Sequence, residues 1–386
     1  MTMETTTAYL EFDSPINSTA LPGSEGDDPQ STAVVVVEAV AISVFAFLTV
    51  VGNALIILSI VRFRILQTIT SAFILNLAVV DFLVGVTLMP AALVTCIAQD
   101  WILGDAFCKI SGVINMFFPV ASISTLSVIA IDRYCAIIRP LKYNSFMTRR
   151  TVAIFLVWVW GQSLLIALLP LTPWSEYKYD RSELLCLIAW SSSELSFAIF
   201  CLFVCIVVPL GIMFFCYYHI LRVARRQSRR VQALKNLSNN ILANNHDSDA
   251  GTSHASDARP ESESHRCHHQ QQQKSKKASG MIRIASRENK STAMMMMVVG
   301  TFMLAWLPYI TGALCKVMEA RECSWPSGYF TVSVLVAMLQ SSLNPIIYGV
   351  MDRRFRGAMK AIVSCSSRTS ANTTIDHHCA GATTVL

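Results

Sequence analysis

Seven long apolar segments divide this chain, and they limit its possible folds more than any other feature. They run over residues 34–60, 68–96, 106–131, 151–172, 195–221, 291–315 and 327–349. Each can cross the roughly 30 Å of hydrocarbon in a bilayer, which takes about 20 helical residues. Because a backbone in lipid must pair its own amides, we expect seven helices. The predicted fold class is an all-α membrane protein, a seven-transmembrane helix bundle.

Composition and charge agree with this fold and give it an orientation. Hydrophobic residues make up 53% of the 386 residues and charged residues 15%, so lipid suits most of the chain better than water. If the N-terminus lies outside, 26 of the 31 Lys and Arg residues lie inside, a strong positive-inside bias. We therefore expect a multi-pass plasma-membrane protein with an extracellular N-terminus and a cytoplasmic C-terminus. The basic residues expected outside are Lys109, Lys178, Arg181, Lys316 and Arg321.

Three segments flank or interrupt the predicted bundle, which spans 34–350. Residues 1–33 are acidic and are expected to be disordered outside the cell, where the sequon at Asn17 predicts N-glycosylation. Residues 222–290 are polar and predict a long disordered third cytoplasmic loop. Residues 351–386 follow as an amphipathic helix and a cytoplasmic tail.

The net charge of +6 suggests nucleic-acid binding and a histidine cluster suggests metal binding, but the positions of these residues support neither function. Basic residues lie beside the membrane spans, which indicates topology and contact with anionic lipid rather than nucleic acid. The histidines of the third cytoplasmic loop lack a fixed scaffold for a metal, so a polar low-complexity loop explains them better. They are His265, His268 and His269.

Asp81 is an acid placed deep in a span, where inserting a charge costs roughly 2.5–3.5 kcal/mol. Helical geometry allows Ser122, Ser341 and Asn344 to turn inward at a similar depth. Together the four side chains would hold an allosteric sodium ion or stabilise a protonated carboxyl. The alternative is an ordinary interhelical hydrogen bond. Four oxygen-bearing side chains at one level favour a functional site, with a sodium ion or a protonated carboxyl, over the ordinary hydrogen bond.

Arg133 lies at the inner end of the third span, and Glu288 lies just before the sixth. An ion pair between them would latch two helices. Its Coulomb gain and desolvation cost nearly cancel, so a small bias would open it. The alternative is a local, solvated pair between Asp132 and Arg133, which would latch nothing.

Prolines inside the spans predict hinges, because each removes a helical hydrogen bond. Pro308 follows Phe302 and Trp306, which are four residues apart and therefore share one helix face. We expect this aromatic pair to act as a lever below the kink. The other two hinge prolines are Pro209 and Pro345.

Seven motifs occur in order, one in each span. They are Gly52-Asn53, Leu77 to Asp81, Asp132-Arg133-Tyr134, Trp160 with Pro170, Pro209 with Tyr217, Trp306-Leu307-Pro308-Tyr309 and Asn344 to Tyr348. Together they resemble the rhodopsin-like, class A family of G-protein-coupled receptors from residue 34 to about 365. Among its members, the sequence is most similar to amine-like orphan receptors. The resemblance implies a receptor and not an enzyme.

The resemblance implies several covalent features. Cys108 and Cys186 match the disulfide of the family; Cys315 and Cys323 either form a second bridge or leave Cys315 reduced. Residues 352–359 resemble its short amphipathic eighth helix, and Cys365 follows as a palmitoylation candidate. The hydroxyl-rich tail beyond is expected to take phosphates from receptor kinases and to recruit arrestin.

The family mechanism implies that a stimulus swings the sixth span outward and admits a heterotrimeric G protein. The residues that match the switch and coupling positions of the family are Asp132, Arg133, Tyr134, Leu141, Tyr217, Glu288, Phe302, Trp306 and Tyr348. The implied partners are a G protein, arrestin, receptor kinases, membrane lipid and a small-molecule ligand.

The ligand is where the sequence departs from the family's best-known branches. Asn115 stands where amine receptors carry an acid, and Met338 where an opsin carries its lysine. The expected pocket is largely apolar, which predicts a small neutral or lipophilic ligand. A constitutively active receptor without a ligand is the main alternative, and a transporter is the rival from another class. The expected lining is Asn115, Met116, Pro119, Cys201, Cys205, Trp306, Tyr309, Ile310 and Met338.

Overall fold

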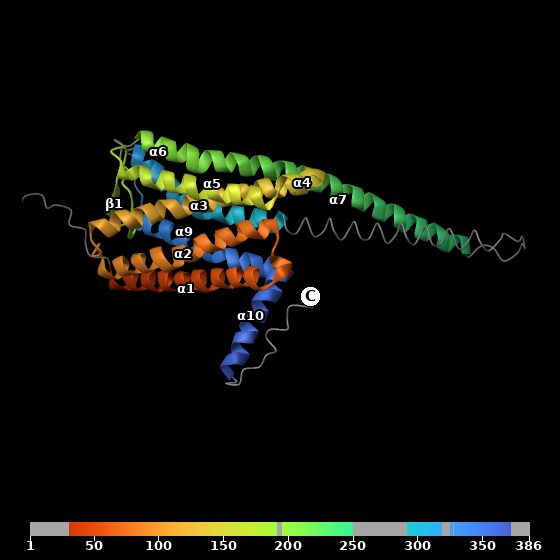
Figure 1. Cartoon of the computed structure of the whole chain (residues 1–386), viewed down its shortest axis with the longest axis horizontal. Coiled ribbons are helices and arrows are strands. Elements are labelled where there is room, and N and C mark those ends of the chain that lie inside the picture. The colour runs from red at the N-terminus through yellow and green to blue at the C-terminus, as the bar shows by residue number, and fades with distance from the viewer. Residues whose placement is uncertain (1–30, 191–194, 250–291, 319–324, 327, 372–386) are drawn as a thin grey trace, which may run out of the picture.

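The computed structural model describes residues 31–190, 195–249, 292–318, 325–326 and 328–371. Within them, seven helices are long and apolar enough to cross a membrane, so the predicted fold class is confirmed (Figure 1). They are α1 (Thr32–Arg62), α2 (Ile69–Ala98), α3 (Asp105–Ile138), α5 (Arg149–Leu168, extended by a turn to Leu171), the fifth span (Leu195–Arg226), the sixth span (Thr292–Met318) and α9 (Tyr329–Met351).

Threonine caps mark where two of these helices begin. The Thr68 hydroxyl accepts a hydrogen bond from the Ser71 amide at the start of α2, and Thr148 does the same for the Thr151 amide at the start of α5. Each cap satisfies an amide that the first turn of a helix leaves without a partner. Both caps lie at the cytoplasmic edge in the predicted orientation.

The third helix is the axis of the bundle. Two thirds of the most apolar part of α3 is buried, against about one sixth for α1. Small hydroxyl residues let neighbouring helices approach α3 closely, and the Thr125 hydroxyl accepts a hydrogen bond from Asn76 of α2. The functional side chains of α3 therefore face the interior along most of its length.

The fifth span is interrupted by a π-helical turn. It consists of α6 (Leu195–Cys201), the π turn over Leu202–Val207 and α7 (Val208–Asp249). At the end of the turn the Val208 amide reaches back five residues to the Phe203 carbonyl. Pro209 follows directly and has no amide hydrogen to donate. The turn changes the direction in which Cys201 and Cys205 point relative to a regular helix.

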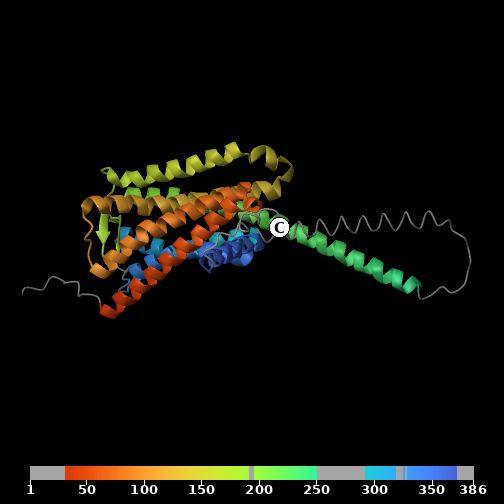
Figure 2. The same cartoon turned by 60° about the horizontal axis from the view of Figure 1, so that its bottom comes forward.

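The long cytoplasmic loop differs from its prediction over its first part. Residues 222–249 continue α7 as helix well beyond the bundle (Figures 1 and 2), where the sequence predicted disorder. Ala, Leu, Arg and Gln recur there and favour helix, which outweighs the polar composition. Residues 250–290 lie outside the described residues.

A β-hairpin between the fourth and fifth spans closes one end of the bundle. Strands β1 (Tyr177–Asp180) and β2 (Leu185–Ile188) are antiparallel, with Tyr177 opposite Ile188. Its inner face is apolar and buried, and the Cys186 sulfur is bonded to Cys108 at the start of α3. The predicted disulfide is therefore present. The sequence analysis did not predict the hairpin.

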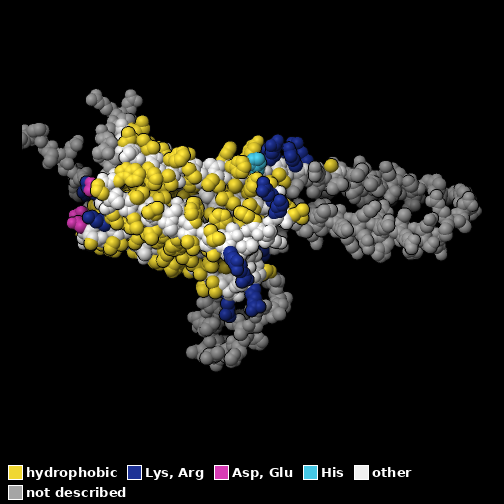
Figure 3. Space-filling model, turned by 45° about the horizontal axis from the view of Figure 1, so that its top comes forward, with side chains coloured by type: hydrophobic (Ala, Val, Ile, Leu, Met, Phe, Trp, Pro, Cys, Tyr) yellow, Lys and Arg dark blue, Asp and Glu magenta, His cyan; other side chains and the backbone are white. Residues whose placement is uncertain are grey.

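The opposite end of the bundle carries two further helices and most of the positive charge. α4 (Pro140–Phe146) follows α3, and α10 (Arg353–Ala371) follows α9. Phe355 of α10 is buried and stacks on Tyr348. Most Lys and Arg side chains in view gather where α7 and α10 leave the bundle, and the acidic side chains lie at the hairpin end (Figure 3). This distribution agrees with the predicted positive-inside orientation.

Candidate functional site

Two apolar cavities of about 130 Å³ each lie between the helices, and hairpin residues line one of them. The side cavity lies between α3, the fifth span and the sixth span; the central cavity lies between α2, α3, the hairpin, the sixth span and α9. The two share one wall, which consists of Met116, Pro119, Trp190, Phe302, Trp306 and Tyr309.

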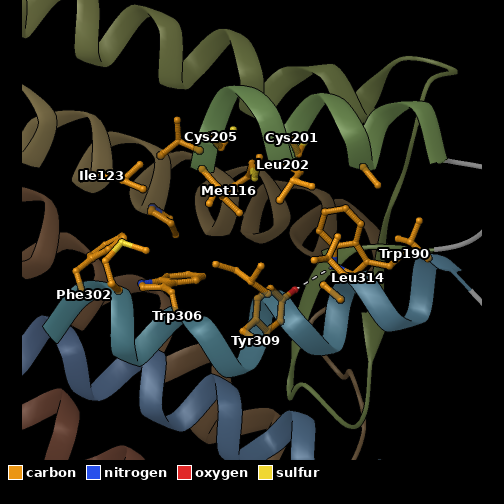
Figure 4. A pocket seen from close by; sticks show the side chains of 18 residues that line it. Met116, Ile123, Trp190, Cys201, Leu202, Cys205, Phe302, Trp306, Tyr309 and Leu314 are labelled. Atoms are coloured by element: carbon orange, nitrogen blue, oxygen red, sulfur yellow. Dashed lines mark hydrogen bonds between the residues drawn. The ribbon is translucent and has the colours of Figure 1, made fainter. Parts of the chain in front are cut away.

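All nine residues of the predicted pocket line one or both cavities. Cys201, Cys205 and Ile310 belong to the side cavity, and Asn115 and Met338 to the central one. Figure 4 shows Phe302, Trp306 and Tyr309 on the sixth span, across the side cavity from Met116, Cys201 and Cys205. The helix positions were therefore predicted from the sequence; what these cavities bind is a separate question.

The hairpin forms the roof of the central cavity. Leu185, Leu187 and Ile188 of β2 line it. The Asn115 amide donates a hydrogen bond of 3.1 Å to the Cys186 carbonyl, so the residue that replaces the acid of amine receptors is engaged by the chain itself. Gly112 of α3 permits this approach, because a Cβ there would lie 2.5 Å from the Tyr177 ring.

An aromatic row on the sixth span connects the roof to the core. The rings of Phe302 and Trp306 stack with centroids 5.9 Å apart, and Tyr309 meets Trp306 edge-on at 6.0 Å. The Tyr309 hydroxyl accepts a hydrogen bond from Trp190 (3.2 Å) and donates one to Glu183 of the hairpin turn (3.3 Å). The two residues of the predicted lever, Phe302 and Trp306, thus line both cavities, and Tyr309 links Trp306 to the hairpin turn.

Asp81 lies in the core beneath the central cavity. The Asn344 amide donates a 2.7 Å hydrogen bond to its carboxylate, and Ser341 is a further hydrogen-bond partner. Ser122 is buried and, like Ser341, lines the central cavity. The Asn344 carbonyl oxygen is buried without a partner in the described structure. A carboxylate beside an unpaired carbonyl oxygen and two hydroxyls is a donor set that fits a hard monovalent cation.

Arg133 is held by its neighbour, and only 17% of its side chain is exposed. Its guanidinium pairs with Asp132 at 2.6 Å and also contacts the Thr70 hydroxyl. The Asp132 side chain is fully buried and accepts 2.7 Å hydrogen bonds from Thr70 and from Tyr143 of α4. Burial, followed by the charge of Asp132, raises the pKa of Tyr143 to about 12, so its hydroxyl stays a donor. We call these four residues the inner cluster.

The inner cluster corrects one alternative of the sequence analysis and leaves the other untested. Asp132 and Arg133 do form a pair. However, α2 and α4 contribute hydrogen bonds to Asp132, so the pair is packed between helices and is not the solvated pair of that alternative. Glu288, the predicted latch partner, lies outside the described residues. Tyr134 turns away from the cluster and packs on Phe215 and His219.

The remaining switch residues differ sharply in exposure. Leu141, the second residue of α4, is 98% exposed and free for a partner. Tyr217 and Tyr348 are buried, and neither hydroxyl has a hydrogen-bond partner in the described structure. Arg133 is therefore bonded to the inner cluster and to neither tyrosine.

The structure describes some, but not all, of the residues with a predicted second disulfide, glycan or palmitate. Cys315 is disulfide-bonded, which excludes the reduced alternative; Cys323 lies outside the described residues. Asn17 also lies outside them. Cys365 falls within α10, further along that helix than the predicted range of 352–359.

Sequence reasoning missed several charged groups near the hairpin end. Glu38 of α1 is only 7% exposed, and the Cys96 thiol of α2 lies 3.8 Å from its carboxylate. Lys316 was counted only as an outward charge, yet it pairs with Asp180 and Glu183. The sequence offered two clues to these contacts: an acid within the first predicted span, and oppositely charged residues at the predicted outer edge of the membrane.

Comparison with known proteins agrees with this arrangement. Residues 52–348 match the family described as 7 transmembrane receptor (rhodopsin family). The chain is 29% identical to G-protein coupled receptor 161 of Mus musculus over 341 residues, covering 88% of the chain and 58% of that protein. It is 29% identical to the alpha-1D adrenergic receptor of Sus scrofa over 362 residues, covering 91% and 60%. The chain thus spans about 60% of the length of these relatives.

Two further matches support the same assignment. The alpha-1A adrenergic receptor of Oryzias latipes is 30% identical over 338 residues, covering 86% of the chain and 68% of that receptor. Squid rhodopsin superposes with a TM-score of 0.70 at 24% identity over 91% of the chain and 94% of its own, which supports the fold. The family match covers the bundle from the first span to the end of the seventh, and the chain belongs to the rhodopsin family of seven-transmembrane receptors.

Proposed function

We propose that this chain is a G-protein-coupled receptor of the plasma membrane that answers a small neutral or lipophilic ligand. Ligand binding moves the sixth span outward, and a heterotrimeric G protein docks at the inner face. The observation that carries this proposal is the shared wall of the two cavities. The Phe302–Trp306 stack is part of that wall and lies on the sixth span, which contains Pro308. A ligand there touches the moving element directly.

The chemistry of the cavities supports a neutral ligand. Thiols, thioethers, aromatic rings and aliphatic side chains make up most of both linings. An apolar cavity of roughly 150 Å³ accepts a molecule of the size of benzene, so each cavity accommodates a similar fragment. A ligand that spans the shared wall would fill both and displace Trp306.

A receptor that signals without a ligand is the second candidate, and the hairpin favours it. Leu185, Leu187 and Ile188 already fill the outer side of the central cavity. Such side chains provide the contacts that a ligand would otherwise supply. Expression level would then set the signal.

At the inner face we propose that Arg133 exchanges partners. It leaves the inner cluster and meets the unpaired hydroxyls of Tyr217 and Tyr348, which removes two buried unsatisfied groups. Leu141 then inserts into the G-protein alpha subunit. A pair of Arg133 with Glu288 would oppose this exchange, and Glu288→Ala should then raise basal signalling.

Asp81, Ser122, Ser341 and Asn344 are proposed to hold an allosteric sodium ion. The ion would supply positive charge beside the Asp81 carboxylate and keep α2, α3 and α9 together. The same residues pair with each other without it, so its effect is on the balance between conformations.

Several further features remain predictions. They are glycosylation at Asn17, palmitoylation at Cys365, phosphorylation of the tail by receptor kinases, arrestin recruitment and contact of the basic inner residues with anionic lipid.

The test is G-protein activation in cells against receptor surface level, read by energy transfer between G-protein subunits. We expect a signal that scales with expression or with added lipophilic ligand and disappears in Arg133→Ala at equal surface level. A signal that survives this substitution would contradict coupling through the inner cluster. No signal across all G-protein classes, with and without a lipophilic compound set, would contradict the receptor proposal.

A further inference from the structure

The ammonium group of Lys316, at the outer end of the sixth span, is surrounded by Asp180, Glu183 and Phe330, which we call the cage. Its Nζ lies 2.7 Å from a Glu183 carboxylate oxygen and 2.8 Å from an Asp180 carboxylate oxygen. The same nitrogen lies 3.8 Å from the centre of the Phe330 ring of α9. Two carboxylates and an aromatic face are the groups that recognise alkylammonium ions.

The cage walls are held in place without help from the lysine. The Thr331 hydroxyl of α9 donates to the Ser182 carbonyl (2.7 Å), and the Thr95 hydroxyl of α2 donates to the Leu184 carbonyl (2.6 Å). The Cys108–Cys186 disulfide ties the next strand to α3. Residues 180–183 are therefore positioned by three other helices, and removal of the Lys316 side chain leaves a preformed site.

The two carboxylates differ in how strongly they need a cation. The Glu183 side chain is only 2% exposed, and its burial raises its pKa despite the attraction of Lys316. Asp180 is 41% exposed; burial opposes ionisation, but hydrogen bonds from Lys316 and Ser182 lower its pKa overall. Glu183 is thus the carboxylate whose charge depends on a bound cation.

The cage adjoins the cavities. The Tyr309 hydroxyl donates 3.3 Å to the second oxygen of Glu183, and Tyr309 lines both cavities. Tyr309 therefore links the Glu183 carboxylate to both cavities. The uncharged Asn115 provides no competing site on α3.

We propose that Asp180, Glu183, Tyr309 and Phe330 form a primary-ammonium binding site that the chain fills with its own Lys316. The lysine then determines specificity: it neutralises the carboxylates at the cavity mouth and excludes cationic ligands. Without Lys316, the site takes a small alkylammonium ion. This inference sharpens the ligand class of the proposed function, but it concerns binding alone and is tested by binding alone.

The experiment uses the full-length receptor in detergent, with thermal unfolding as the readout. Lys316→Ala removes the equivalent of a propylammonium ion, so propylammonium chloride is the probe. We expect Lys316→Ala to lower Tm, and propylammonium to restore it in a saturable manner while leaving wild type unchanged. 1-Propanol and tetramethylammonium are the controls, since the first lacks charge and the second cannot donate a hydrogen bond.

Matched variants identify the site. Lys316→Arg should keep the wild-type Tm, and Lys316→Ala combined with Glu183→Gln should lose the rescue by at least tenfold in probe concentration. A shift of equal size in wild type, a shift that persists in the double variant, or no rescue of a destabilised Lys316→Ala would each overturn the proposal. An unchanged Tm in Lys316→Ala without added probe would overturn it as well.

If Lys316→Ala does not accumulate at the cell surface, expression in medium with propylammonium provides the second measurement. Recovery of surface receptor with propylammonium, and not with propanol, supports the site; absence of recovery contradicts it. G-protein signalling plays no part in either readout, so failure here leaves the proposed coupling untouched, and the reverse also holds.

Discussion

The two ends of this bundle differ in how their polar groups are paired. At the hairpin end, side chains from α2, α3, the sixth span and α9 all bind one rigid hairpin, by a disulfide, hydrogen bonds and ion pairs. At the inner end, one buried carboxylate gathers three donors, while two tyrosine hydroxyls nearby stay unpaired. The groups that fasten the hairpin to the helices are paired, although the Tyr179 hydroxyl of β1 is not, and the inner end keeps two hydroxyls unpaired for a second arrangement.

Because of this difference, we expect the two ends to have different functions. A network with every group paired resists movement, because any shift leaves buried groups without partners. A cluster beside unpaired hydroxyls can exchange partners at small cost, because each hydroxyl oxygen can accept a hydrogen bond from the guanidinium. Substitutions at the hairpin end should therefore act mainly on stability, and substitutions at the inner end mainly on signalling.

The largest loss is expected when the hairpin is released from α3. Cys186→Ser removes the bond to Cys108, and loss of a native disulfide costs about 2–5 kcal/mol. Thermal unfolding in detergent should show the decrease, and Cys108→Ser should match it, with no further loss in the double variant. Additive losses would mean that the two thiols act separately.

A second substitution tests how closely the hairpin fits against α3. Gly112→Ala places a Cβ 2.5 Å from the Tyr177 ring, and such overpacking costs about 1–3 kcal/mol. Gly161→Ala on α5 is the control, since nothing lies within 4 Å of its added Cβ. We expect a lower Tm only for the first variant; equal Tm values would refute close packing.

The core between the two ends should respond to sodium. If Asp81 binds the ion, sodium at ten times its dissociation constant stabilises wild type by about 1.4 kcal/mol. Replacing sodium with choline at constant ionic strength should lower the wild-type Tm and leave Asp81→Asn unchanged. A sodium effect that persists in the variant would remove Asp81 from this role.

The smallest change concerns stability at the inner end. Tyr143→Phe removes one of the donors to Asp132, and a single hydrogen bond contributes about 0.5–1.5 kcal/mol. The Tm should fall slightly while basal signalling rises, because the cluster holds Arg133 less firmly. A fall in Tm without any change in signalling would separate Tyr143 from the switch.

Much of this architecture was predictable because one physical rule dominates it. Lipid demands long apolar helices, so the spans appeared directly in the hydrophobic pattern, and interior polar residues such as Asp81 and Asn344 stood out against it. Motif resemblance then placed the cavity residues, from Asn115 to Met338, on the correct helix faces. The Cys108–Cys186 bridge followed from the same resemblance.

The parts that were missed depend on contacts between distant segments. Lys316 and Glu183 are 133 residues apart, and no local pattern pairs them. The hairpin itself is short and packs by burying Tyr177 and Leu185, a tertiary effect that strand propensity alone does not reveal. The prediction of disorder for residues 222–249 was wrong for the opposite reason, because local helix propensity prevailed over a polar composition.

The most direct test of the exchange at the inner end is basal G-protein activation of Asp132→Asn at matched surface expression. This substitution keeps the shape of the side chain and removes the charge that holds Arg133. We predict activation several-fold above wild type, and none when Arg133→Ala is added. Activation at or below the wild-type level would contradict a restraining role for the inner cluster.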